Sequence, residues 1–256
     1  CSAWPRLCRS FLALSAVPLA LAMTSAMGTQ ANTTPARING DAVTDRRLCL
    51  RCTQGNPAIG RLPHAGLVCL RHKRWIGSSP QVDLRAYSAA LTAERHYRSH
   101  LAARGVLFDS FAMELGRACA NSVFIGIQEI ERRRQHTDIE TIAPLVYPEQ
   151  VKFARMLTSR TFLEYVTDPA REANDRRARI TQEITKILPV WDASESWRVT
   201  ERIWEVARRL AQLRRESLLW GTPIRDSYYN LLRFIGRPDL VIDDKWDDYG
   251  IRPSTY

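Results

Sequence analysis

The sequence lacks a long hydrophobic run. Nowhere do about 18 or more apolar residues follow one another, so we expect no transmembrane helix and no membrane association. The Walker loop, the G-x-G-x-x-G and G-x-S-x-G motifs and the acid clusters of nucleases are absent as well. Histidine and cysteine are scarce, with 5 His and 6 Cys in 256 residues. These absences favour a protein that is not an enzyme.

Four of the scarce residues form two tight pairs. Cys49 and Cys52 make a C-x2-C pair, sixteen residues follow, and Cys69 and His72 make a C-x2-H pair. Each pair brings two ligands to one side of a turn, and folding of the intervening loop completes a tetrahedron. The spacing predicts a structural Zn²⁺ site. His64 is the alternative fourth ligand if His72 does not bind the metal.

Acidic residues are missing around this site. None lies between Cys49 and Asp83. A catalytic zinc keeps an open coordination position and usually has an acid nearby, so this metal is expected to be structural. A zinc hydrolase stays as an alternative that requires an open site. Because three cysteines join one metal site and a chain of this size needs no disulfides, we expect a reducing, cytoplasmic compartment.

Positive charge is concentrated near the same site. The net charge is +10, and residues 46–104 hold eleven Lys and Arg against two acids, Asp83 and Glu94. Concentrated positive charge favours polyanions through counterion release, so DNA or a nucleoprotein complex is the expected partner. A solvated basic face that keeps the protein in solution is the alternative. The predicted phosphate contacts are Arg71, Lys73, Arg74, Arg95 and Arg98.

A second histidine pair is a weaker candidate for metal binding. His96 and His100 lie four residues apart on a predicted helix, which is the spacing of a two-ligand edge. Tyr97 stands where metalloproteases have a glutamate, so no general base accompanies the pair. An exposed helix face is the favoured interpretation.

The N-terminal region, residues 1–45, is predicted to be a helical segment followed by a linker. Residues 6–27 run from basic to apolar to small side chains, the order of a secretory signal. Helical spacing before Pro18 supports a packed helix instead, and we favour that reading. Because the chain begins with Cys1, we expect the N-terminal region to be truncated.

The rest of the chain predicts a mainly α fold. A small zinc-stapled finger, residues 46–80, is expected between the N-terminal helical segment and a C-terminal helical bundle, residues 81–236, with an acidic tail at 237–256. Trp75 is expected to cover the metal site. Apolar periodicity and caps predict helices over 84–105, 109–134, 148–165 with Pro148 in its first turn, 171–188, 194–219 and 222–234. Trp197, Ile203, Trp204, Ala207, Leu210 and Leu218 are expected to face inward.

The finger resembles the zinc-finger region of the TniQ family. The matching residues are Cys49-Leu50-Arg51-Cys52, then Cys69-Leu70-Arg71-His72, with Trp75 just beyond. Family members commonly show a CPxC pair, a loop and a C-x-x-H pair, preceded by a short helical region that residues 4–27 would provide. The resemblance covers roughly residues 1–115. Leu50 departs from it, because the family often has proline there.

The resemblance implies an accessory protein of mobile elements. TniQ-like proteins act in target-site selection during transposition, bridge a target-recognition element to other transposition proteins, and often form homodimers. They are not the recombining enzyme. The expected function is therefore that of a cytoplasmic, non-catalytic, zinc-binding adaptor that associates with DNA. A protein-binding helical scaffold, braced by a structural zinc and without nucleic-acid affinity, is the alternative.

Overall fold

The computed structural model describes residues 37–38, 41–42, 44–122, 127–188, 193–221, 231 and 233–235. All of them belong to one unit, Pro35–Tyr256. The predicted N-terminal helical segment with its signal-like stretch, the acidic tail and most of the predicted helix 222–234 lie outside the described residues.

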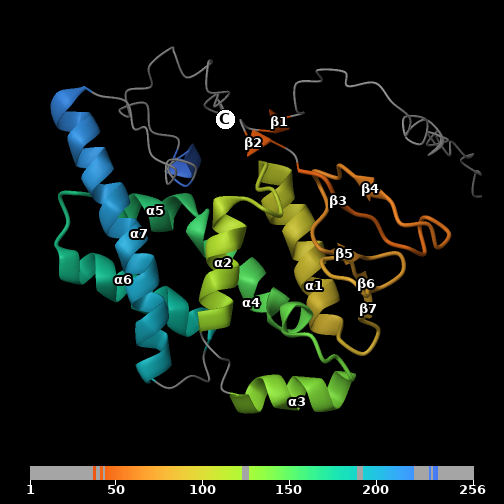
Figure 1. Ribbon diagram of the computed structural model, residues 1–256. Coiled ribbons are helices and arrows are strands. Elements are labelled where there is room, and N and C mark those ends of the chain that lie inside the picture. The colour runs from red at the N-terminus through yellow and green to blue at the C-terminus, as the bar shows by residue number, and fades with distance from the viewer. Residues whose placement is uncertain are drawn as a thin grey trace, which may run out of the picture. The chain divides into compact units, whose positions relative to one another are not determined.

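Helices make up most of the described chain, which confirms the mainly α prediction (Figure 1). They are α1 (Ser88–His96), α2 (Phe111–Ser122), α3 (Ile127–Thr137), α4 (Ile142–Leu157), α5 (Arg160–Val166), α6 (Ala173–Ile187) and α7 (Ala193–Trp220). Helix α1 continues into a π-helical turn, η2 (Tyr97–Leu101), and a 3₁₀ turn, η3 (Ala102–Arg104). A further 3₁₀ turn is η4 (Arg233–Ile235).

The strands are short and antiparallel. They are β1 (Arg37–Ile38), β2 (Asp41–Ala42), β3 (Arg46–Arg47), β4 (Ile59–Gly60), β5 (Val68–Cys69), β6 (Arg74–Trp75) and β7 (Val82–Asp83). Strand β1 pairs with β2, β3 pairs with β4, and β5, β6 and β7 form one sheet in that order. Figure 1 shows β3 to β7 gathered beside α1. The structure therefore contains the small finger that the sequence predicts.

Helix α4 forms the centre of the core. It packs against α2 and α1, and its residues are buried from Pro144 through Val151 without a polar face. Tyr147 and Phe153 are among the largest fully buried side chains. A helix with so long a buried run needs several neighbours, and α1, α2, α3, α5 and α6 all contact α4.

Gly116 lets α2 approach α4 closely. A Cβ at this residue would lie 2.7 Å from the carbonyl oxygen of Gln150 and 3.2 Å from the backbone nitrogen of Ala154. We expect Gly116→Ala to lower the free energy of unfolding by about 1–3 kcal/mol, the usual cost of overpacking. This loss comes in spite of alanine's helix preference, worth about 1 kcal/mol. Urea denaturation measures it, and Glu114→Ala on the exposed face of α2 should change stability by no more than about 0.5 kcal/mol. An unchanged Gly116→Ala protein would contradict the close approach.

The first two helix predictions need correction. The helix predicted over 84–105 begins only at Ser88, because β7 occupies Val82–Asp83; its end at Gly105 is confirmed by a left-handed φ of +79°. The single helix predicted over 109–134 is wrong, since α2 and α3 run in different directions in Figure 1. The predicted cap, Asp109, accepts a hydrogen bond from the Thr44 hydroxyl at 2.5 Å.

The position predicted for Pro148 is also wrong. Helix α4 begins at Ile142, so Pro148 lies in its interior and not in its first turn. A proline there cannot donate the N–H bond to the residue four positions earlier, and burial of α4 from Pro144 through Val151 outweighs this loss. The segment that was expected to continue to residue 165 divides into α4 and the separate helix α5.

Helices α6 and α7 confirm the helices predicted over 171–188 and 194–219 to within two residues at each end. Ile203, Ala207 and Leu210 are buried as expected. The inward positions given to Trp197 and Leu218 are wrong, because these side chains are 60% and 49% exposed. They lie near the two ends of α7, where helical periodicity continues but these side chains are not covered by the described residues.

Candidate metal centre and basic finger

Two turns position the Cys and His side chains. In the first, the backbone N–H groups of Cys52 and Thr53 both donate to the carbonyl of Cys49, at 2.8 and 3.1 Å. In the second, Cys69 ends β5 and His72 lies in the turn before β6. Gln81, directly before β7, holds the first turn in place, because its side chain accepts from the Leu50 N–H and donates to the Leu48 carbonyl.

The ligand atoms of Cys49, Cys52, Cys69 and His72 converge. All four lie within 4.8 Å of one another. The Nδ1 atom of His72 lies 3.6, 3.3 and 3.8 Å from the sulfurs of Cys49, Cys52 and Cys69, and the Cys52 and Cys69 sulfurs are 3.7 Å apart. The structure therefore brings together the four residues that the spacing predicts, as a group that could hold a metal ion.

The sulfurs compete for negative charge. Burial alone raises the pKa of the Cys49 thiol, but hydrogen bonds from the backbone of Cys52 and from the side chain of Cys69 outweigh it and lower that pKa. Burial, followed by the neighbouring Cys69 and Cys49 sulfurs, raises the pKa of Cys52 to about 12. Metal ligation requires thiolates, and a bound cation supplies the charge that lets crowded sulfurs ionise together.

Other candidate ligands lie outside the group. His64 is exposed and does not belong to it. Within the part of the chain that the structure describes, no Asp or Glu joins the four residues. The arrangement thus offers three sulfurs and one nitrogen, a set suited to a closed tetrahedral site.

The predicted phosphate contacts are placed in two different settings. Arg71 and Lys73 are exposed in the turn between β5 and β6, on either side of His72, and Arg95 is exposed on α1. Arg74 is half-buried and donates to the Gln81 carbonyl at 3.0 Å. Arg98 is half-buried as well and donates to the Glu94 carboxylate at 2.7 Å and to the Val68 carbonyl at 3.0 Å.

Glu94 anchors the finger to the helices. Its side chain on α1 is fully buried and accepts from the backbone N–H groups of Gly66 and Val68, at 2.8 and 3.3 Å. It also accepts from the Tyr147 hydroxyl on α4 at 2.7 Å and from Arg98. The guanidinium of Arg46 donates to the Gly66 carbonyl. Hydrogen bonds from three elements therefore converge on one carboxylate, which holds the finger against α1 and α4.

Sequence reasoning missed this anchor, although a signal was present. Leu91, Glu94 and Leu101 all fall on the stripe that faces the core, and Glu94 is the acid among apolar residues there. A charged residue is almost never fully buried unless it is paired, so an acid on an apolar stripe indicates partners brought from elsewhere.

Trp75, the residue predicted to cover the metal site, packs against the helices. Its ring stands edge-on to Tyr147, with centroids 5.2 Å apart and an interplanar angle of 73°. It belongs to the core that the finger shares with the helices. Its contribution is to join the finger to α4 through an edge-to-face aromatic pair.

The His96 and His100 rings contact each other. Their centroids are 4.3 Å apart and nearly perpendicular. His96 Nε2 lies 3.3 Å from Arg155 Nη1, and a guanidinium can only donate, so this nitrogen accepts. Among the described residues, the pair belongs to no group of three metal ligands.

Comparison of the chain with protein-family models, with curated proteins and with solved structures finds no match. The TniQ resemblance therefore rests on the pattern in residues 46–76 and stays a prediction. Within the described residues, no helix combines the length and the apolar character needed to cross a membrane.

Proposed function

We propose that the Cys49, Cys52, Cys69 and His72 group binds Zn²⁺ in a closed structural site. A tetrahedron with the usual Zn–S and Zn–N bond lengths has S···S edges of about 3.8 Å and S···N edges of about 3.6 Å. Four of the six separations, 3.7 Å between the Cys52 and Cys69 sulfurs and 3.3 to 3.8 Å between sulfur and nitrogen, are close to those edges, and the others are at most 4.8 Å. Because the protein supplies all four ligands, no position is left for a substrate or an activated water. We therefore propose that this metal site is structural and catalyses no reaction.

The finger is proposed to contact the phosphates of DNA. The observation that carries this proposal is the placement of Arg71 and Lys73 on either side of His72, both exposed. Among the ion pairs of the described residues, none involves either side chain. A metal that fixes His72 also fixes this turn, so the two cations are presented without a large cost in backbone ordering.

The adaptor role follows from combining this finger with the TniQ resemblance. A cytoplasmic protein of this kind would bridge DNA, or a nucleoprotein complex, to transposition proteins, as a homodimer. The rigid attachment of the finger through Glu94 supports such a role, because a partner bound to the helices would be held at a fixed distance from the DNA.

The test is a salt series of binding to labelled duplex DNA, followed by fluorescence anisotropy. Each lost phosphate contact lowers the slope of log K against log salt by about 0.9, so the Arg71→Ala, Lys73→Ala double variant should lose about 2 units of slope. Its affinity at low salt should fall at least about tenfold. The matched control is the Arg85→Ala, Arg160→Ala double variant, because these two arginines are exposed but already paired with Asp83 and Glu164.

Two outcomes would contradict the proposal. Equal losses in the two double variants would mean that net charge alone drives binding. A metal-loaded protein with no DNA affinity at low salt would favour the protein-binding scaffold instead.

A further inference from the structure

A large cleft lies on the helical part of the molecule, away from the metal ligands. Its volume is about 1050 Å³, and helices α1, α3, α4, α5 and α6 line it. Part of the lining is apolar, from Ala93, Val151, Met156 and Phe162. Sites for small organic ligands have volumes of about 300–1,000 Å³ with apolar walls and a few polar groups, so this cleft is large enough for one.

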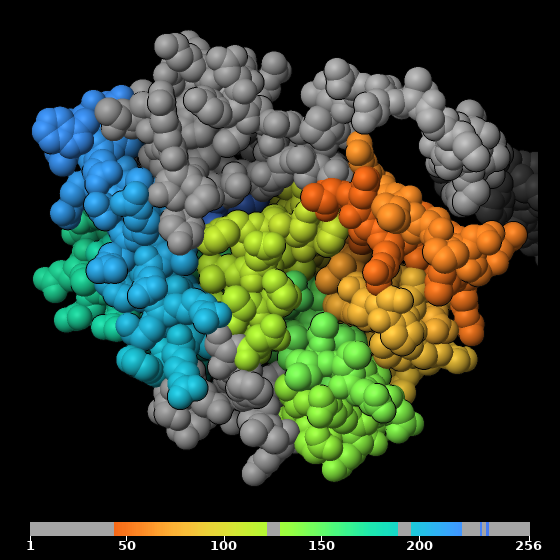
Figure 2. Space-filling model, viewed as in Figure 1, coloured from red at the N-terminus to blue at the C-terminus, as the bar shows by residue number. Residues whose placement is uncertain are grey.

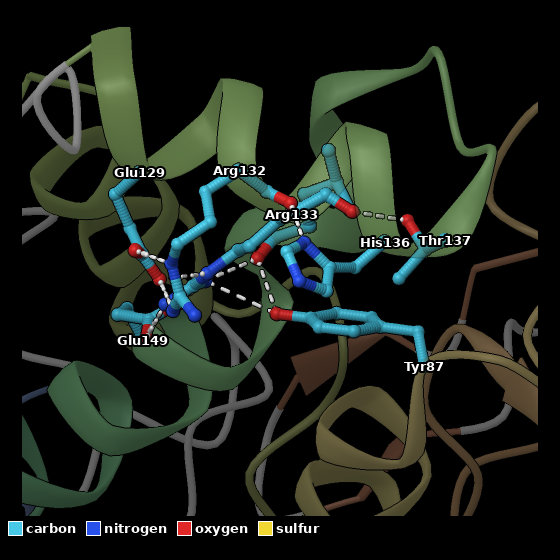
Figure 3. A network of polar contacts seen from close by, with 8 residues as sticks. Tyr87, Glu129, Arg132, Arg133, His136, Thr137 and Glu149 are labelled. Atoms are coloured by element: carbon cyan, nitrogen blue, oxygen red, sulfur yellow. Dashed lines mark hydrogen bonds and ion pairs between the residues drawn. The ribbon is translucent and has the colours of Figure 1, made fainter.

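The charged side chains in the cleft leave a positive excess. Six Lys and Arg line it against three Glu, and the three acids are already engaged. Glu129 pairs with Arg132 and Arg133, and Glu149 pairs with Arg133, which also donates to the Tyr87 hydroxyl (Figure 3). On α6, Glu183 pairs with Arg179 and Lys186. The acids therefore neutralise their own neighbours and not the remaining cations.

Lys152 and Arg155 are those remaining cations. They lie three residues apart on α4, both are exposed, and among the described residues no ion pair includes either of them. The contact of Arg155 is to His96 Nε2, a neutral acceptor. Residues three apart on a helix share a face, so the Lys152 and Arg155 side chains can close on one ligand group.

His96 and two hydroxyl groups complete the surroundings. Burial, Arg155 and His100 lower the pKa of His96, which means that this corner of the cleft already disfavours additional positive charge. The Ser159 and Thr161 hydroxyls, 3.2 Å apart, also line the cleft. Cations that are paired with no acid, beside hydroxyl donors, form a setting in which an anion gains several charge-assisted hydrogen bonds.

We propose that this cleft binds a phosphate-bearing organic ligand. The phosphate contacts Lys152 and Arg155 beside His96, and the organic part lies over the apolar lining. The site uses no residue of the finger, so it stands or falls independently of DNA binding by the finger.

Calorimetry with inorganic phosphate, and then with a nucleoside monophosphate, tests the site. Inorganic phosphate should bind saturably at one site, and the nucleotide should bind more tightly because it also covers apolar surface. Arg155→Ala and Lys152→Ala should each weaken binding by about tenfold, since each removes one charge-assisted contact. Lys186→Ala is the matched control: it lines the same cleft but is paired with Glu183, and binding should change less than about twofold.

Because Lys152 and Arg155 are exposed, both variants should fold like the wild type, and circular dichroism verifies this. Absence of saturable phosphate binding would overturn the proposal, and so would equal losses in Arg155→Ala and Lys186→Ala. A nucleotide no tighter than inorganic phosphate would overturn the organic part. A competition experiment with a short oligonucleotide identifies the source of the phosphate. If the oligonucleotide displaces inorganic phosphate, its binding should be weakened by Arg155→Ala and unchanged in the Arg71→Ala, Lys73→Ala variant. That result would mean that the phosphate belongs to a nucleic-acid strand.

Discussion

His72→Ala is expected to abolish metal binding and to leave the finger without a stable fold. The strands β3 to β7 have two residues each, so the finger has little backbone pairing of its own. Structural zinc contributes about 10–16 kcal/mol of apparent binding free energy in zinc-finger peptides, and that energy is folding energy. Loss of one ligand of four removes most of it. Metal content of the purified protein and hydrogen exchange of the finger amides measure the effect.

His64→Ala is the matched control. It makes the same substitution in the same loop at an exposed histidine outside the ligand group. We expect one metal ion per chain and unchanged exchange of the amides. A His72→Ala protein that keeps its metal with full affinity, or a His64→Ala protein that loses it, would contradict the assignment of the ligands.

Cobalt substitution distinguishes a structural site from the zinc hydrolase alternative. A closed site of three sulfurs and one nitrogen gives a tetrahedral cobalt spectrum with thiolate charge-transfer bands that added anions do not perturb. An open site would take up anions and change its coordination. The absence of an acid in the ligand group among the described residues favours the first result.

The candidate site is the part of the molecule that the sequence predicted best. Two x2 pairs restrict their side chains to one side of a turn, so local spacing alone places Cys49 with Cys52 and Cys69 with His72. Whether the two pairs come together depends on the fold of the chain between them, and in the structure they do come together. The mainly α class followed from apolar periodicity in the same direct way.

What the sequence did not predict depends on distant neighbours. Pro148 signals a helix start, but burial of α4 from Pro144 through Val151 carries the helix through it. Trp197 and Leu218 continue the apolar period of α7, yet among the described residues their side chains are exposed. Trp75 is three residues from His72, but its ring packs on Tyr147 from α4. In each case periodicity or proximity in the sequence gave one answer, and tertiary packing decided otherwise.

Glu94→Ala is expected to lower the free energy of unfolding by about 3–5 kcal/mol, the range found when a buried ion pair loses one partner. The substitution leaves the N–H groups of Gly66 and Val68 and the hydroxyl of Tyr147 buried without their acceptor. Urea denaturation measures the change. Glu140→Ala, at an exposed acid between α3 and α4, is the control and should change stability by no more than about 0.5 kcal/mol.

Gly66→Ala tests the same anchor without removing a charge. A Cβ at this residue would come within 3.0 Å of both the Glu94 carboxylate and the Tyr147 hydroxyl, closer than real Cβ atoms approach. The finger would have to move away from α1, and we expect a loss of about 1–3 kcal/mol from overpacking. A Gly66→Ala protein as stable as the wild type would contradict the packing of the finger on Glu94.

The metal content of these variants separates the anchor from the metal site. Glu94 is not a ligand, and the four ligand side chains lie on turns that their own backbone bonds and Gln81 hold. The Glu94→Ala protein should therefore still bind one metal ion per chain while its finger amides exchange faster, whereas His72→Ala loses the metal itself. If Glu94→Ala also lost the metal under native conditions, the finger could not form without its contact to α1, and attachment to the helices, not metal binding, would be the step that folds it.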